Sequence, residues 1–165
     1  MKWLVLVLLL LSSAARAETR WALVIGNDRG LSHEVDLAYA EADAKKMHAL
    51  LRELGGVAPE NATLLLGEDA ATARRTLVSL NDRIRQSNPA QATLIVYYSG
   101  HADESALHMG ETSFELSELE ALVRGSSAAL RLVVLDACLR GGLRAASWGR
   151  RCRSSGSSSA RRWMG

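Results

Sequence analysis

The sequence predicts an α/β fold of three layers, α-β-α, with helices on both faces of a mostly parallel sheet. Short apolar segments alternate along the chain with amphipathic segments of helical period, as strands and helices do in parallel α/β proteins. The apolar segments are too hydrophobic for a sheet with one face in water, so helices must cover both faces. The chain has 165 residues, 48% hydrophobic and 23% charged, which suits one globular domain rather than a disordered chain.

The first half of the chain supplies two strand–helix units. Residues 21–26, WALVIG, form a short apolar run that ends in a Gly-Asn-Asp loop. A helix is expected over residues 36–54, where apolar side chains recur at helical spacing before a Gly-Gly stop. Residues 62–67, ATLLLG, are the second expected strand, and residues 72–86 are the second expected helix.

The second half repeats this order. Residues 92–100, ATLIVYYSG, are the clearest strand because they are rich in β-branched and aromatic side chains. A short strand or hairpin arm is expected over residues 106–110. Ser117 and Glu120 match a capping box, which predicts the start of a third helix. Residues 130–136, LRLVVLD, are the fourth expected strand.

The two ends of the chain differ in composition from its body. Residues 1–17 contain Lys2, nine consecutive apolar residues and a final Ala-Arg-Ala, the pattern of a secretory signal peptide. Nine apolar residues are too few to span a bilayer, so we expect an exported protein, periplasmic or secreted, without membrane contact after signal removal; an uncleaved anchor is the alternative. Residues 143–165 are rich in Ser, Gly and Arg, which predicts a disordered tail. The globular domain is therefore expected over residues 18–142.

Charge and cysteine content exclude several classes of function. Residues 18–138 carry 11 basic and 18 acidic side chains, whereas residues 139–165 carry seven arginines and no acidic side chain. A nucleic-acid partner would depend on that tail alone, so none is expected. The loop GNDRG, residues 26–30, matches neither a P-loop nor a dinucleotide-binding pattern. Two cysteines do not make a disulfide framework, and the sequence leaves open whether Cys138 and Cys152 pair.

Reactive side chains follow the third and fourth predicted strands. His101 comes directly after Ser-Gly, and Cys138 closes the Asp-Ala-Cys triplet. Ligands of open parallel sheets bind beyond the carboxyl ends of the strands, and neighbouring strands lie about 4.8 Å apart. If the two strands are neighbours, the imidazole and the thiol leave the same edge, where a histidine activates a cysteine as a nucleophile. The alternatives are a buried structural cysteine and an ordinary polar histidine.

Four sequence blocks, in this order, resemble the caspase-like cysteine peptidases, in the bacterial branch related to metacaspases and paracaspases. The blocks are WALVIGND, AYAEADAKKMHALL, YYSGH and DAC, at residues 21–28, 38–51, 97–101 and 136–138. The resemblance covers roughly residues 20–142. It implies a caspase-like fold and the hydrolysis of peptide bonds, with Cys138 as the nucleophile and His101 as its general acid and base.

The resemblance also implies residues that bind the substrate. The oxyanion hole would use the backbone N–H groups of Cys138 and Ala102. Metacaspases line the primary pocket with two carboxylates, and Asp43 and Asp136 match those positions, whereas Leu37 stands where a caspase has its arginine. Carboxylates bind cations through charge-assisted hydrogen bonds, so cleavage of proteins or peptides after Arg or Lys is expected. For Asp43 the alternative is a solvated charge on a helix surface.

The chain departs from the family pattern in three places. Ala102 replaces the usual glycine after the histidine, and Arg140 replaces a small residue close to the thiol. The chain ends 27 residues after Cys138, so the C-terminal strands of the family are expected to be missing, through truncation or a lost reading frame. The activity of this chain therefore stays open, and the alternative is a catalytically inactive exported fragment that binds a peptide or protein. No metal or other cofactor is expected; calcium dependence and oligomeric state are left open.

Overall fold

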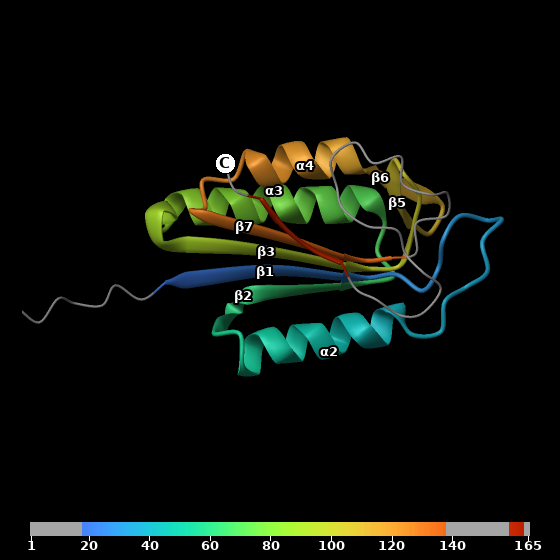
Figure 1. The fold of residues 1–165 in the computed structure, drawn as a ribbon, viewed down its shortest axis with the longest axis horizontal. Coiled ribbons are helices and arrows are strands. Elements are labelled where there is room, and N and C mark those ends of the chain that lie inside the picture. Colours follow the sequence, from blue (N-terminus) through green and yellow to red (C-terminus); the bar gives the residue numbers. More distant parts are fainter. Residues whose placement is uncertain (1–17, 138–158, 164–165) are drawn as a thin grey trace, which may run out of the picture.

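The computed structural model describes residues 18–137 and 159–163, and its centre is a five-stranded sheet in the order β2-β1-β3-β7-β8. Four strands run parallel, as Figure 1 shows: β1 (Thr19–Gly26), β2 (Val57–Leu66), β3 (Ala92–Ser99) and β7 (Leu130–Asp136). The prediction of a mostly parallel sheet is confirmed.

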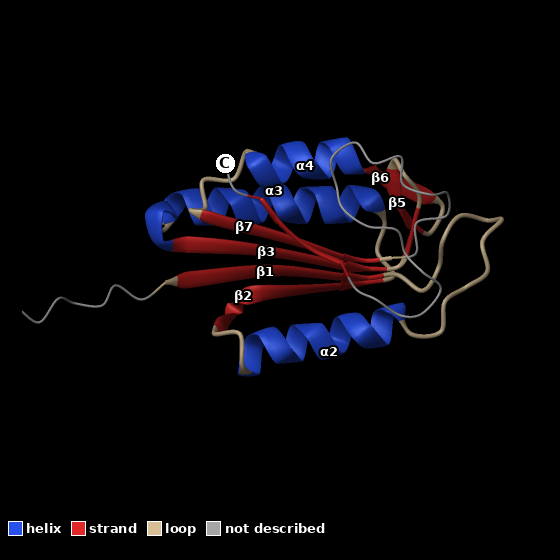
Figure 2. Ribbon diagram, viewed as in Figure 1, coloured by secondary structure: helices blue, strands red, loops and turns tan. Residues whose placement is uncertain are grey.

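Helices cover both faces of this sheet. Helix α2 (Ala40–Glu53) lies on one face, while α3 (Ala70–Gln86) and α4 (Leu116–Arg124) lie on the other (Figure 2). A short 3-10 helix, η1 (Pro89–Gln91), leads into β3. The three predicted layers are therefore present.

Alternate residues of β1 pack into the two cores. Trp21, Leu23 and Ile25 belong to the core formed with α3 and α4, whereas Ala22 and Val24 belong to the core formed with α2. Successive side chains of a strand point to opposite faces, so a strand buried on both faces must be apolar at every position. This explains the unbroken apolar run that begins at Trp21.

The first two helices begin at other residues than predicted. Helix α2 begins at Ala40 rather than at residue 36. Helix α3 begins at Ala70, two residues before its predicted start, because the Asp69 carboxylate caps it by accepting a 2.7 Å hydrogen bond from the Thr72 N–H.

The capping box predicted for the third helix is wrong. Helix α4 begins at Leu116, so Ser117 lies inside its first turn, and the N-cap residue Glu115 makes no side-chain cap hydrogen bond. The Leu116 N–H instead donates a 2.7 Å hydrogen bond to the Ser105 carbonyl. A tertiary contact thus takes the place of the expected local cap.

A small antiparallel sheet lies beyond the carboxyl ends of the parallel strands (Figure 1). It consists of β4 (His101–Ala102), β5 (Ala106–Met109) and β6 (Thr112–Glu115). Strand β5 confirms the short strand expected over residues 106–110. Gly110 has a φ of 61°, which allows the tight turn from β5 into β6.

Strand β8 (Ser159–Trp163) pairs antiparallel with β7. The sequence predicted no regular structure over residues 143–165, and the structure differs from that expectation at these five residues. Strand pairing uses backbone groups, which almost any sequence supplies, so the composition of the tail did not indicate it. The predicted signal peptide, residues 1–17, lies outside the described residues. Within the described part of the chain, no helix is long and apolar enough to cross a membrane.

Candidate active site

The third and fourth predicted strands, β3 and β7, are parallel neighbours in which Ser99 is paired with Asp136. The condition set in the sequence analysis, that these two strands are neighbours, is therefore met. In the sequence, His101 comes two residues after Ser99, and Cys138 comes two residues after Asp136. Cys138 and its predicted contact with the imidazole lie outside the described residues.

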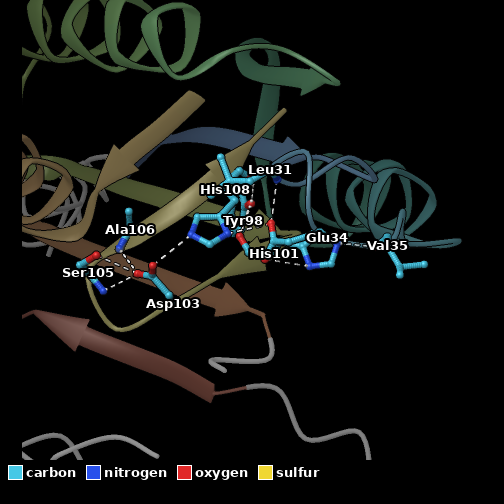
Figure 3. Close-up of polar contacts among 9 residues, drawn as sticks. All are labelled: Leu31, Glu34, Val35, Tyr98, His101, Asp103, Ser105, Ala106 and His108. Atoms are coloured by element: carbon cyan, nitrogen blue, oxygen red, sulfur yellow. Dashed lines mark hydrogen bonds and ion pairs between the residues drawn. The ribbon is translucent and has the colours of Figure 1, made fainter. Parts of the chain in front are cut away.

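The ring of His101 is held by the loop that precedes α2. Its Nε2 lies 2.9 Å from the carbonyl oxygen of Val35 (Figure 3). A carbonyl oxygen only accepts hydrogen bonds, so Nε2 carries a proton and donates it. In the neutral ring, Nδ1 is then the atom with a lone pair to accept a proton.

A buried carboxylate, that of Glu34, lies near the second ring nitrogen of His101. Oε1 of Glu34 lies 3.8 Å from His101 Nδ1, and the two side chains are only 5% and 11% exposed. The second oxygen, Oε2, accepts a 2.8 Å hydrogen bond from the Leu31 N–H and lies 2.9 Å from His108 Nδ1. Burial acts to raise the pKa of the Glu34 carboxyl, but the Leu31 hydrogen bond and the His108 contact outweigh it, so this pKa lies below its usual range.

His108 connects Glu34 to a second carboxylate. Its Nε2 lies 3.2 Å from Asp103 Oδ2. The other oxygen of Asp103 accepts hydrogen bonds from the Ser105 N–H, the Ser105 hydroxyl and the Ala106 N–H. Burial acts to raise the pKa of Asp103, yet these hydrogen bonds and the one from His108 lower it to about 2. His108 thus stands between two anionic side chains.

A buried tyrosine attaches this histidine pair to the main sheet. The Tyr98 hydroxyl lies 2.7 Å from the carbonyl oxygens of both His101 and His108. Tyr98 has no exposed surface, and its burial raises the pKa of the hydroxyl well above its usual range. The hydroxyl therefore stays protonated and fixes β4 and β5 to the end of β3.

The charges of both predicted substrate-binding carboxylates, Asp136 and Asp43, act on the hydroxyl of Tyr97, and Asp136 contacts it directly. The Tyr97 hydroxyl, in the core formed with α2, donates a 3.0 Å hydrogen bond to Asp136 Oδ2. Burial, followed by the charge of Asp136 and more weakly that of Asp43, raises the pKa of Tyr97 to about 12. Asp43 is 42% exposed and also pairs with Lys46 at 3.0 Å, as a helix-surface charge would. Both its predicted role and the alternative are thus compatible with its position.

The predicted oxyanion residue Ala102 lies on β4, opposite Leu107, and is buried. A strand conformation is open to any residue with a Cβ, so the alanine does not strain this segment. No group of three or more His, Cys, Asp or Glu side chains among residues 18–137 is arranged to hold a metal ion.

Sequence reasoning missed Glu34, Asp103 and His108. An Asp side chain can accept a hydrogen bond from the backbone N–H two residues on, as Asp103 does from Ser105, so Asp103 was a signal from which a tight turn could have been predicted. A hairpin about that turn brings His108 opposite His101, as the β4–β5 register has it. No periodic pattern in the sequence indicated the path of the loop that contains Glu34.

Comparison with known proteins agrees with this architecture. The family model of the Caspase domain matches residues 19–160. No curated protein matches the chain. A solved protein from Geobacter sulfurreducens is similar, with a TM-score of 0.61 and 22% identity over 73% of this chain and 50% of the other. The structure of pro-sf-caspase-1 is similar with a TM-score of 0.56 and 13% identity over 85% of this chain and 54% of the other.

At these identities the solved structures show a shared fold, and the chain spans about half of their length (50% and 54%). The match to the family model extends over most of the sequence, from β1 into β8. The chain belongs to the caspase domain family.

Proposed function

We propose that this chain is a cysteine endopeptidase that hydrolyses peptide bonds after Arg or Lys through Cys138 and His101. The observation that supports it best is the pairing of Ser99 with Asp136, because His101 and Cys138 each follow that pair by two residues. Membership of the caspase domain family supports the reaction class.

The hydrogen bonding of His101 indicates how the proton moves. Its Nε2 is committed to the Val35 carbonyl, so Nδ1 takes the proton of the Cys138 thiol. The sulfur attacks the scissile carbonyl carbon, and the backbone N–H groups of Ala102 and Cys138 are the proposed donors to the oxyanion. The intermediate collapses to a thioester as the C–N bond breaks, and the departing amine takes the proton from Nδ1. Water then gives a proton to Nδ1, attacks the thioester and releases the acid, and the proton returns to the sulfur.

The proposed specificity depends on the carboxylates next to Tyr97. Asp136 accepts a hydrogen bond from Tyr97, and the charge of Asp43 acts on the same hydroxyl. Asp136 ends β7 and Asp43 lies in the first turn of α2. A carboxylate favours a cationic side chain, and a guanidinium binds a carboxylate in a bidentate manner. The substrate would then place Arg or Lys against this end of the sheet.

The test compares hydrolysis of fluorogenic peptides that end in Arg, Lys or Asp. We expect turnover of the first two, a loss of at least about 1,000-fold in kcat for Cys138→Ala, and full activity for the matched control Cys152→Ala. Unchanged activity of Cys138→Ala would contradict the assigned nucleophile. Preference for the Asp-ended peptide would contradict the acidic pocket, and no turnover by folded wild-type protein would contradict the endopeptidase itself.

A further inference from the structure

We propose that Glu34 is a positioning residue for His101, and that His108 and Asp103 hold the Glu34 carboxylate in place for this task. The inference rests on the proposed function, in which His101 is the general acid and base. It adds a side chain that stabilises the proton on His101 Nδ1 during the reaction.

The four side chains form one continuous series in which carboxylates and imidazoles alternate (Figure 3). Asp103 Oδ2 lies 3.2 Å from His108 Nε2, and His108 Nδ1 lies 2.9 Å from Glu34 Oε2. The series ends where Glu34 Oε1 lies 3.8 Å from His101 Nδ1. It joins the loop before α2 to β4 and β5, so it links three segments around the proposed base.

The contact between Glu34 and His101 is suited to stabilise the positive charge that develops on the His101 ring during the reaction. With Nε2 donating to Val35, the neutral His101 ring has its lone pair on Nδ1, which lies 3.8 Å from Glu34 Oε1, too far for a hydrogen bond. Once Nδ1 takes the thiol proton, the same pair becomes an imidazolium beside a carboxylate, within ion-pair distance. The Glu34 side chain is 5% exposed, so water screens this attraction only weakly.

The position of Glu34 is fixed from two sides. Both ring nitrogens of His108 face carboxylate oxygens, so the ring donates to both only when it carries two protons and a positive charge. The backbone of Gly30 closes the other side, because a Cβ there would lie 2.1 Å from Glu34 Oε2 and 2.6 Å from His101 Cδ2. Only glycine allows the loop to approach this closely.

A purely structural role for Glu34 makes a different prediction. In that case the carboxylate only ties Leu31 to His108, and the electronic state of the His101 ring does not depend on its charge. The two roles are separated by observing the His101 ring directly and by separating kcat from KM.

The test uses Glu34→Gln in the full chain, with Glu53→Gln, an exposed residue at the far end of α2, as the matched control. Nitrogen-15 NMR of labelled histidines reports the state of His101 Nδ1, with the signals of the four histidines assigned by single substitutions. We expect Glu34→Gln to shift the Nδ1 signal and to lower kcat about 10- to 100-fold with KM changed less than about twofold, and the control to change neither.

An unchanged Nδ1 signal together with unchanged kcat in Glu34→Gln would overturn the positioning role. If the wild-type protein hydrolyses no peptide, the endopeptidase proposal fails, and the NMR signal alone decides: a shift supports the role, and no shift overturns it. If Glu34→Gln does not fold, Glu34→Asp withdraws the charge by one methylene. A shifted Nδ1 signal in that variant supports the role, and an unchanged signal overturns it.

Discussion

Tyr97 on β3 donates a 3.0 Å hydrogen bond to Asp136 Oδ2 at the end of β7. Burial, and then the charge of Asp136, raises the pKa of Tyr97 to about 12, so the hydroxyl keeps its proton and remains a donor at neutral pH. Tyr97 lies in the core formed with α2. The orientation of the Asp136 carboxylate is therefore set by the sheet rather than by a mobile surface group.

The first prediction concerns this carboxylate. Asp136→Asn should lower kcat/KM for Arg-ended peptides about 10- to 100-fold, because the amide loses the charge-assisted hydrogen bond to the guanidinium. Hydrolysis of a peptide with a neutral residue at the same position should change much less. The matched control is Asp82→Asn, since Asp82 pairs with Arg85 on the surface of α3. Equal losses of kcat/KM for the charged and the neutral peptide would show that Asp136 does not bind the charged group of the substrate.

The second prediction concerns the contact between β1 and α2. A Cβ on Gly26 would lie 2.6 Å from Ala44 Cβ and 2.8 Å from Glu41 Cα, both on α2. Gly26→Ala should therefore push the helix away and lower the free energy of unfolding by about 1–3 kcal/mol. Urea denaturation measures this change.

Gly125→Ala is the matched control for Gly26→Ala. Gly125 caps α4 with right-handed helical angles, and the nearest atom to an added Cβ is the Ala121 carbonyl oxygen at 3.2 Å. We expect its free energy of unfolding to stay within about 0.5 kcal/mol of wild type. Equal free energies of unfolding for the Gly26 variant and this control would mean that α2 moves away from the added Cβ without a loss of stability.

The parallel sheet was predictable from the sequence because its strands are buried on both faces. Residues 92–100 and 130–136 were expected as strands, and the structure has β3 at Ala92–Ser99 and β7 at Leu130–Asp136. Burial on both faces leaves an unbroken apolar run, which few other elements of this length produce. Their adjacency was only a condition of the sequence argument, because the segment between them is long enough for a crossover to a neighbouring parallel strand but does not require one.

The surroundings of the site were less predictable. His101 was identified because it directly follows a strand, whereas Glu34 and His108 meet across 74 residues of sequence. Their contact depends on how a loop and a hairpin pack against each other, and neither has a periodic pattern. Strand β8 was missed for a related reason. It pairs with β7 through backbone groups, and almost any segment in an extended conformation can add to the edge of a sheet in this way.

The third prediction concerns the hydroxyl that anchors the histidine pair. Tyr98→Phe removes the group that lies 2.7 Å from the carbonyl oxygens of His101 and His108. Because the contact with the His108 carbonyl is buried and the one with the His101 carbonyl is partly buried, losing the hydroxyl should cost about 1–3 kcal/mol of the free energy of unfolding. Tyr39→Phe is the control, since Tyr39 is 71% exposed, and it should unfold like wild type. Equal urea midpoints for the two variants would contradict the anchoring role.

The last prediction is a pH dependence of stability that comes from Asp103. Its folded-state pKa is about 2, below the ordinary value of 3.8, so the folded protein favours the carboxylate. This contribution is complete above the ordinary value and is lost as the pH falls from 3.8 to about 2, because the unfolded chain takes up the proton first. Asp103→Asn cannot titrate. The wild type should therefore be the more stable at neutral pH, by about 1 kcal/mol, a low value because the Asp103 side chain is 43% exposed.

Urea unfolding of wild type and Asp103→Asn, measured from neutral pH down to about pH 2.5, tests this expectation. The difference between their free energies of unfolding should shrink as the pH falls, because the wild type loses the stabilising carboxylate while the variant has none to lose. Glu104→Gln removes a charge from the neighbouring exposed residue and controls for net charge. A gap between wild type and Asp103→Asn that stays constant over this range would mean that the Asp103 carboxylate gains nothing from its contacts with Ser105, Ala106 and His108.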